Sequence, residues 1–173
     1  AEAGVARGTF YLYFDDKETI FRALVGAVLD PVVDALLDAR KALDEATDAD
    51  DRQEAYQILA QSVVEIVGTN PSATLLYYRE QRNPGPIGDW LRTRGAQLDA
   101  FIGDLIESLM HRDLIRKTDH QAVALAIMGA IDRLAYAWLG NQLTGDPAEV
   151  AGEVVRLFSA GLMDAEDAKA VAP

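Results

Sequence analysis

The stretch AGVARGTFYLYFDDKETIF, from Ala3 to Phe21, combines a short helix and the start of a longer one in a compact corner of the chain. The short helix is predicted over residues Ala6 to Tyr13 and follows a turn that contains a glycine. Its apolar side is formed by Phe10 and Phe14, which are spaced i to i+4. Because the other sides carry basic, hydroxyl and tyrosine side chains, the helix should be docked along one side only. We expect the function to lie in this corner.

The second helix of the stretch is predicted to open at Asp16. Asp15 and Asp16 are good N-cap residues, and Lys17 then occupies the first helical position. A cation at that position opposes the helix dipole. A phosphate oxygen bridging Lys17 and the free backbone amides would explain this placement. A solvated lysine is the alternative.

Beyond this corner, the periodicity predicts helices throughout, so the fold class is all-α. Apolar residues keep a helical period from Ile20 to Leu43, interrupted at Asp30-Pro31, where the helix should be kinked or restarted. The segment NPGPIG, residues 83–88, is the strongest helix breaker in the sequence. Further helices are expected to contain the residue ranges 56–67, 72–81, 90–110, 118–140 (with Thr118 and Gln121 as a capping box) and 147–162.

Composition limits the domain count and the classes of partner. The chain has 173 residues, of which 50% are hydrophobic, enough for one good core with a small appended subdomain. Its net charge of -12 argues against a body that binds nucleic acid or anionic membranes, so any DNA contact must be local. The chain contains no cysteine, which excludes disulfides and thiolate metal sites and suits a reducing cytoplasm.

The segment from Ala122 to Leu139 is almost wholly apolar. Its two charged residues, Asp132 and Arg133, are adjacent near the centre, where a membrane span would not tolerate them, so a buried helix is expected instead. One stripe of this helix is bulky and suits a core, whereas another is small and suits the close approach of a second helix. We predict a two-fold dimer through this helix and the last one; the alternative is that the small stripe faces a helix of the same chain. The predicted interface residues are Ala126, Gly129, Ala130, Arg133, Ala137, Val154 and Phe158.

Asp132 lies on an otherwise apolar helical face, where a carboxylate is either paired or available to a ligand. An ion pair with Arg79, Arg92 or Arg94 is one interpretation. The other is an effector pocket in which Asp132 orients a polar or cationic group. The predicted lining of that pocket is Tyr77, Trp90, Phe101, Met128, Asp132 and Tyr136.

Enzymatic chemistry finds little support in the sequence. The two histidines, His111 and His120, belong to no HExxH or ExxH metal motif, and no serine stands in a nucleophile-elbow motif. We therefore expect no catalytic residues, no metal site and no cofactor.

The opening stretch resembles the TetR family of transcriptional repressors. The resemblance lies in A-G-V-x-R-G-T-F-Y-L-Y-F-x-x-K-E-x-I-F, which matches the second half of that family's helix-turn-helix and the start of its fourth helix. Over the rest of the chain, the similarity is in helix number, length and order. The resemblance implies a partial helix-turn-helix DNA-binding domain with its linking helix in residues 1–30. It implies a ligand-binding and dimerisation domain in residues 31–173.

By this resemblance, residues Ala6 to Tyr13 form the recognition helix. The implied DNA contacts are Arg7, Gly8, Thr9, Tyr11, Leu12, Tyr13 and Lys17. Ala6 occupies the position of the usual Ser or Thr cap, which should weaken the helix by about 1 kcal/mol. The family's first helix and most of its second would precede Ala1.

The function expected from this resemblance is a cytoplasmic repressor that binds operator DNA as a homodimer and is released by a small-molecule effector. The alternative is a helical-bundle protein that only dimerises or binds a hydrophobic ligand, without binding DNA.

Overall fold

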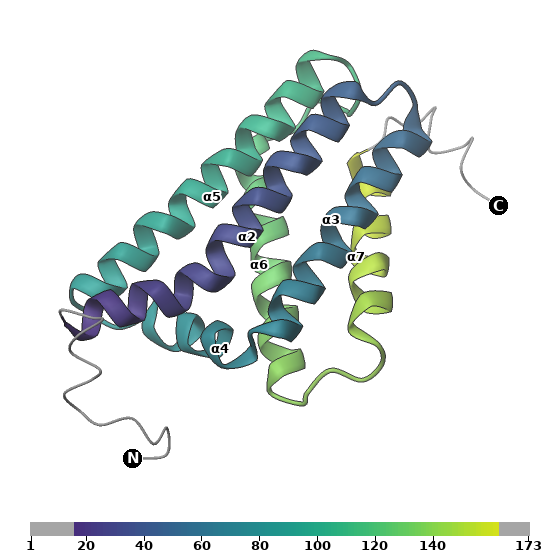
Figure 1. The fold of residues 1–173 in the computed structure, drawn as a ribbon. Helices are drawn as coiled ribbons and strands as arrows, with labels where there is room; N and C mark the ends of the chain where they lie inside the picture. The colour runs from purple at the N-terminus through teal and green to yellow at the C-terminus, as the bar shows by residue number, and fades with distance from the viewer. Residues whose placement is uncertain (1–15, 163–173) are drawn as a thin grey trace.

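The computed structural model describes residues 16–162, and these residues form helices joined by short turns (Figure 1). The all-α prediction is confirmed for this part of the chain. The helices are α2 (Lys17–Glu45), α3 (Ala49–Thr69), α4 (Pro71–Glu80), α5 (Pro86–His111), α6 (His120–Leu139) and α7 (Pro147–Leu162).

Helix α2 begins where the sequence predicted. Asp16 is its N-cap and accepts hydrogen bonds from the backbone nitrogen of Thr19 at 2.7 Å and from the Thr19 hydroxyl at 3.0 Å. The helix contains Pro31 and continues to Glu45, so it bends rather than restarting, and Figure 1 shows the change of direction in its first half. The domain boundary expected between residues 30 and 31 therefore falls inside one continuous helix.

The turn between α4 and α5 is closed by two glycines. Gly85 has a φ of 110°, in the region that favours glycine, and it is the N-cap of α5. Gly88 is buried, and a Cβ atom added there would lie 1.9 Å from the Asn83 carbonyl oxygen. The predicted breaker at residues 83–88 is thus a turn whose backbone approaches too closely for a side chain.

The caps of α6 and α7 are aspartates. For α6, the expected capping box of Thr118 and Gln121 is wrong: Asp119 is the N-cap, and its carboxylate accepts from the backbone nitrogens of Gln121 and Ala122, both at 3.0 Å. A carboxylate at this position also faces the positive end of the helix dipole. Asp146 likewise accepts hydrogen bonds from the backbone nitrogens of Ala148 and Glu149 in the first turn of α7.

Helix α2 packs against α3, α3 also packs against α7, and α5 packs against α6 (Figure 1). Arg112, just after α5, donates to the carbonyl oxygens of Leu43 at 2.9 Å and Asp44 at 3.2 Å, which closes the C-terminal end of α2. Arg116 joins the α5–α6 turn to the end of α7 through the carbonyls of Gly161 and Leu162.

Helix α6 is, among the described residues, the one helix whose length and composition would allow it to cross a membrane. It is nevertheless a member of the bundle and packs along α5. Only Ala124, Ala135 and Ala137 of α6 are buried within the chain. The expectation that this helix is buried on all sides is therefore not met by one chain alone.

Candidate functional site

The first part of the site is the exposed N-terminus of α2. Lys17 is the first helical residue and is exposed to solvent. The hydrogen bond from the Thr19 backbone nitrogen, followed by that from its hydroxyl, lowers the pKa of the Asp16 carboxyl, so the cap is a carboxylate at neutral pH. The other predicted DNA-contacting residues lie outside the described residues: Arg7, Gly8, Thr9, Tyr11, Leu12 and Tyr13.

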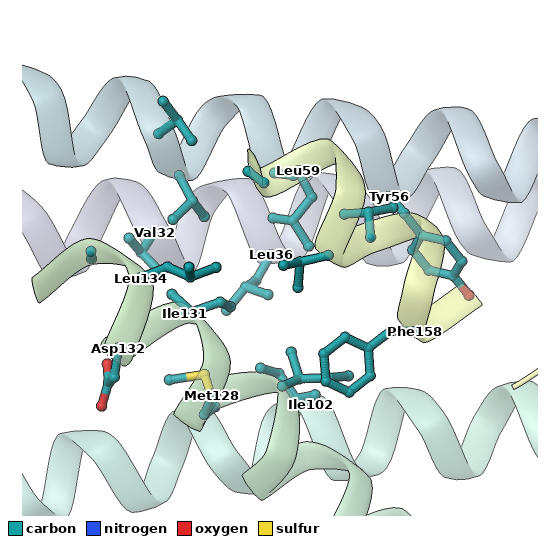
Figure 2. A pocket seen from close by; sticks show the side chains of 18 of the residues that line it. Val32, Leu36, Tyr56, Leu59, Ile102, Met128, Ile131, Asp132, Leu134 and Phe158 are labelled. Atoms are coloured by element: carbon teal, nitrogen blue, oxygen red, sulfur yellow. The ribbon is translucent and has the colours of Figure 1, made fainter. Parts of the chain in front are cut away.

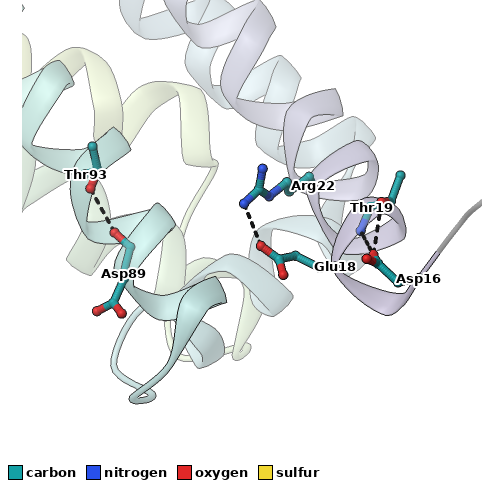
Figure 3. A network of polar contacts seen from close by, with 6 residues as sticks. All are labelled: Asp16, Glu18, Thr19, Arg22, Asp89 and Thr93. Atoms are coloured by element: carbon teal, nitrogen blue, oxygen red, sulfur yellow. Dashed lines mark hydrogen bonds and ion pairs between the residues drawn. The ribbon is translucent and has the colours of Figure 1, made fainter.

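The beginning of α2 is held against the beginning of α5 by aromatic contacts. Phe21 meets Trp90 edge to face, with ring centroids 6.3 Å apart and planes at 81°. The Arg22 guanidinium lies over the same indole, 5.5 Å from its centroid, and is also paired with Glu18. Figure 3 shows Glu18 and Arg22 on α2 facing the α5 turn that carries Asp89 and Thr93.

The second part of the site is a cavity of about 270 Å³ in the middle of the bundle, lined by residues from each of the described helices. Figure 2 shows lining side chains from α2, α3, α5, α6 and α7. The walls of the cavity are largely apolar, with aliphatic and aromatic side chains. Along α3 the lining extends from Ala49 to Val67, a rise of about 27 Å, so the cavity is elongated along this helix. The aliphatic lining includes Val32, Leu36, Leu59, Ile102, Ile131 and Leu134.

The structure brings together only half of the predicted pocket residues. Tyr77, Met128 and Asp132 line the cavity. Trp90 instead packs on Phe21, and Phe101 lies under the Arg40 guanidinium, 5.7 Å from its ring centroid. Tyr136 is 49% exposed on the outer side of α6 and meets the Tyr78 ring edge to face at 6.1 Å. Helical spacing placed these rings on apolar faces but could not tell which neighbouring helix each one meets.

Asp132 is the carboxylate of the cavity. It accepts one hydrogen bond, from the Tyr78 hydroxyl, at 3.3 Å. Burial raises the pKa of Asp132 to about 6 against the opposing effect of that hydrogen bond, and Asp99 adds to the rise while Arg82 counters it. Burial likewise raises the pKa of Tyr77 to about 12, and it also raises the pKa of Tyr78. The negative charge of Asp132 adds to the rise at both hydroxyls.

The ion-pair interpretation of Asp132 is not supported in the described part of the chain. Each of the proposed arginines pairs elsewhere: Arg79 with Glu80 at 2.8 Å, Arg92 with Asp89, and Arg94 with Asp30 at 3.7 Å. The arginine side chains are long enough to reach several carboxylates, and they find partners nearer in the sequence or on the surface.

Sequence reasoning missed several polar residues of the lining. Tyr78 adjoins Tyr77 on α4, and its own hydroxyl is the one that reaches Asp132. Arg52 and Tyr56, on the first turns of α3, line the opposite part of the cavity. The TLLYY run of α4 was visible in the sequence, but the partner of its second tyrosine is 54 positions away.

The predicted dimer residues divide between two sides. Ala126, Gly129 and Arg133 are exposed on α6, and a Cβ added at Gly129 would meet nothing within 4 Å. Ala130 is partly buried and Ala137 is buried. Val154 and Phe158 line the cavity. The exposed apolar surface on these helices also includes Leu125, 60% exposed, and Leu157, 72% exposed.

Comparisons with known proteins agree with this arrangement. Residues 1–24 match the family described as bacterial regulatory proteins, tetR family. No curated protein sequence matches the chain. A solved structure assigned to the TetR family of transcriptional regulators, from Syntrophomonas wolfei str. Goettingen, superposes with a TM-score of 0.72 at 19% identity, covering 95% of this chain and 83% of the other.

A second solved structure, a protein of unknown function from Rhodococcus sp. RHA1, superposes with a TM-score of 0.67 at 19% identity. The overlap covers 94% of this chain and 81% of that one. At this identity the two structures establish the likeness of fold, while the first 24 residues carry the sequence match. The first 24 residues are thus similar in sequence to the tetR family of bacterial regulatory proteins, and the chain shares the fold of these two solved structures.

Proposed function

We propose that the protein is a dimeric transcriptional repressor that a small molecule, bound in the central cavity, releases from its operator. The observation that carries the proposal is the course of α2. Its first residues belong to the segment that matches the tetR family, and its later residues Val28, Val32 and Leu36 line the cavity. One helix thus joins the proposed DNA contact to the proposed ligand site.

This helix offers a physical route for the response. A ligand that fills the cavity pushes on the inner side of α2, and its N-terminal end is held to α5 through Phe21 and Trp90. A small change in the bend of α2 would move Lys17 and the preceding residues relative to their counterparts in a second subunit. The ligand then shifts the population toward dimers whose recognition helices do not match the operator.

A homodimer is supported by the apolar surface that one chain leaves uncovered. Leu125, Gly129 and Tyr136 lie on the exposed side of α6, and Leu157 is exposed on α7. A second copy packing on this surface would bury it and would place two recognition helices in successive major grooves, about 34 to 36 Å apart. The small residues Ala126 and Gly129 would allow a close helix contact.

In the proposed complex, Thr9, Tyr13 and Lys17 contact phosphates, and Arg7, Tyr11 and Leu12 face base edges or thymine methyl groups. Gly8 lets the protein backbone approach the duplex. Lys17 and the free amides at the start of α2 form an anion-binding end that suits a phosphate. Because the body of the protein is acidic, with a net charge of -12, the attraction to DNA is confined to this end.

The test uses the chain together with any residues encoded upstream of Ala1. Binding sites are selected from random duplex DNA, and affinity is then measured for the wild type and for Thr9→Ala, Tyr13→Phe and Lys17→Ala. Each loss of a phosphate contact should weaken binding several-fold, and Lys17→Ala should reduce the salt dependence by about one counterion. Lys41→Ala, at the far end of α2, is the matched control. Unchanged affinity in all the N-terminal variants would refute the assigned contacts.

A second candidate function is supported by the cavity itself. A helical-bundle protein that binds an apolar molecule and dimerises needs the cavity and the α6 surface but no DNA. If the selection yields no preferred sequence while the apolar probes described below bind, this second function is favoured over the repressor.

A further inference from the structure

One end of the cavity carries polar groups around Asp132. Its carboxylate accepts from the Tyr78 hydroxyl at 3.3 Å, which is long for a hydrogen bond between oxygens. A carboxylate has room for about four donors, so most of its capacity is unused. Thr74, another polar residue of the lining, donates its hydroxyl to the Asn70 carbonyl at 2.9 Å and is already satisfied. Asp132 is therefore a charged acceptor of the cavity lining with capacity to spare.

Aromatic rings stand beside this carboxylate. Tyr77 and Tyr78 both line the cavity, and their ring centroids are 5.2 Å apart with planes at 69°. Tyr136 packs edge to face on the other side of Tyr78. Tyrosine rings attract a cation through their negative faces, so a carboxylate flanked by them forms the kind of surroundings that bind an organic ammonium group.

No side chain of the described residues provides a cation in contact with Asp132. No arginine or lysine of residues 16–162 lies within ion-pair distance of Asp132. From α5, Asp99 adds negative charge, and its effect on the Asp132 pKa exceeds that of Arg82, which follows α4. The two remaining neighbours, Tyr77 and Tyr78, keep their hydroxyl protons because burial raises the pKa of both.

The opposite end of the cavity does not offer an equivalent site for an anion. Arg52 lines the cavity there, but it belongs to the first turns of α3, which carry Asp48, Asp50 and Asp51. The charge of Arg52 already helps to lower the pKa of Asp51, after the hydrogen bonds from Thr47. An anionic head group at this end would meet a net negative surface.

We propose that the Asp132, Tyr77 and Tyr78 end of the cavity binds the protonated nitrogen of a lipophilic amine, whose elongated apolar body occupies the aliphatic remainder. This inference rests on the proposed ligand role of the cavity and adds the chemical class of the ligand. Asp132 supplies the counter-charge, Tyr78 orients the carboxylate, and the aliphatic walls set the hydrophobic requirement.

The experiment compares probes that share one alkyl chain and differ in the head group: decylamine, decanol and decanoate. Calorimetric titration into the 173-residue chain is performed at about pH 8, where the amine and Asp132 are both charged. Decylamine is expected to bind about tenfold more tightly than decanol, because its ammonium adds a charge-assisted hydrogen bond. Decanoate is expected to bind more weakly than decanol.

Two variants assign the preference to a residue. Asp132→Asn should bring the affinity for decylamine to within about threefold of that for decanol, because the negative charge that distinguishes the two head groups is removed. Asp99→Asn is the matched control: it removes a neighbouring carboxylate that does not line the cavity, and the amine preference should persist. In the wild type, the preference should also decline as the pH falls below about 6, since Asp132 then becomes neutral.

The outcomes separate this inference from the proposed ligand site. Equal binding of decylamine and decanol, tighter binding of decanoate, or an amine preference that survives Asp132→Asn would overturn the amine assignment while leaving the cavity as a binding site. Failure of every probe to bind would overturn both. The comparison of head groups in the wild-type protein does not depend on the folding of any variant.

Discussion

The ring of Phe21 on α2 packs edge to face on the indole of Trp90 on α5, with centroids 6.3 Å apart. Phe21 is 7% exposed, and the guanidinium of Arg22 covers the same indole from the next position of α2. This contact fixes the first turns of α2 on the bundle. We therefore expect a change at this contact to alter the position of the first turns of α2 on the bundle.

Replacing Trp90 by alanine should release the beginning of α2. The change removes the partner of Phe21 and the platform of Arg22, so the free energy of unfolding should fall by about 2 to 3 kcal/mol. Operator affinity should fall more than stability alone predicts, while decanol binding in the cavity stays within about twofold. Denaturant titration and the two binding assays measure these effects. A loss of decanol affinity as large as that of DNA affinity would contradict the separation of the two sites.

Asp132→Asn should stabilise the protein in a pH-dependent way. The folded-state pKa of Asp132, about 6, lies above the ordinary value of 3.8, so the folded state binds the proton more tightly than the unfolded state. This group favours folding fully below pH 3.8, and its contribution is lost as the pH rises through about 6. The variant should therefore be more stable than the wild type by about 2 to 3 kcal/mol near neutral pH and equal to it in acid.

Urea titrations of both proteins across this pH range measure the difference. A stability difference that does not change with pH would mean that Asp132 is not desolvated as described. Tyr78→Phe should raise the pKa of Asp132 further, because the hydroxyl that favours the ionised carboxylate is removed.

Ala60→Leu should fill part of the cavity. Ala60 lines it from α3, and the added carbons would be removed from water, which should raise the unfolding free energy by about 1 kcal/mol. The same change should weaken decanol binding at least about tenfold, because the probe and the side chain compete for one space. Ala100→Leu, on the exposed side of α5, is the control and should alter neither quantity. Unweakened decanol binding in Ala60→Leu would place the probe elsewhere.

Gly129→Arg tests the proposed dimer. Gly129 has open space around it within one chain, so an arginine is compatible with the folded subunit. If α6 packs on a second copy there, the variant should raise the dimer dissociation constant at least about a hundredfold. Sedimentation equilibrium gives this constant, and Gln61→Arg on the exposed side of α3 provides the same charge change elsewhere. Identical association of both variants would refute an interface at Gly129.

Gly88→Ala should destabilise the turn before α5. The new methyl group would overlap the Asn83 carbonyl oxygen, and backbone atoms have to move to relieve the overlap, at a cost of about 2 to 3 kcal/mol. Gly95→Ala, later in the same helix, is the control. Its methyl would stand 4.0 Å from the Tyr77 hydroxyl, so the helix should gain about 1 kcal/mol from the better helix former. Thermal unfolding of the two variants measures the expected loss of stability in Gly88→Ala and the expected gain in Gly95→Ala.

The sequence alone was sufficient for the helices because their signals are local. Asp16 and Asp146 start helices through hydrogen bonds to residues within three positions, and the Asn83–Gly88 segment ends one through backbone sterics. The family could be recognised for the same reason, since its pattern occupies consecutive residues. The cap of α6 was misplaced by one residue because Thr118 and Asp119 are both suitable caps, and only the backbone geometry distinguishes them.

The partners of side chains were decided by the tertiary structure. Trp90, Phe101 and Tyr136 all lie on helices with apolar faces, yet each meets a different surface: Phe21, Arg40 and Tyr78. Val154 and Phe158 line the cavity because α7 packs on α3. The helical period of α7 does not predict which helix covers its apolar face. Periodicity specifies a face but not the helix that covers it, since the crossing of two helices depends on contacts distant in sequence. For that reason the sequence determined the helices and the likeness of its first 24 residues to the TetR family, whereas the cavity and the place of Asp132 in its lining depend on how the helices pack together.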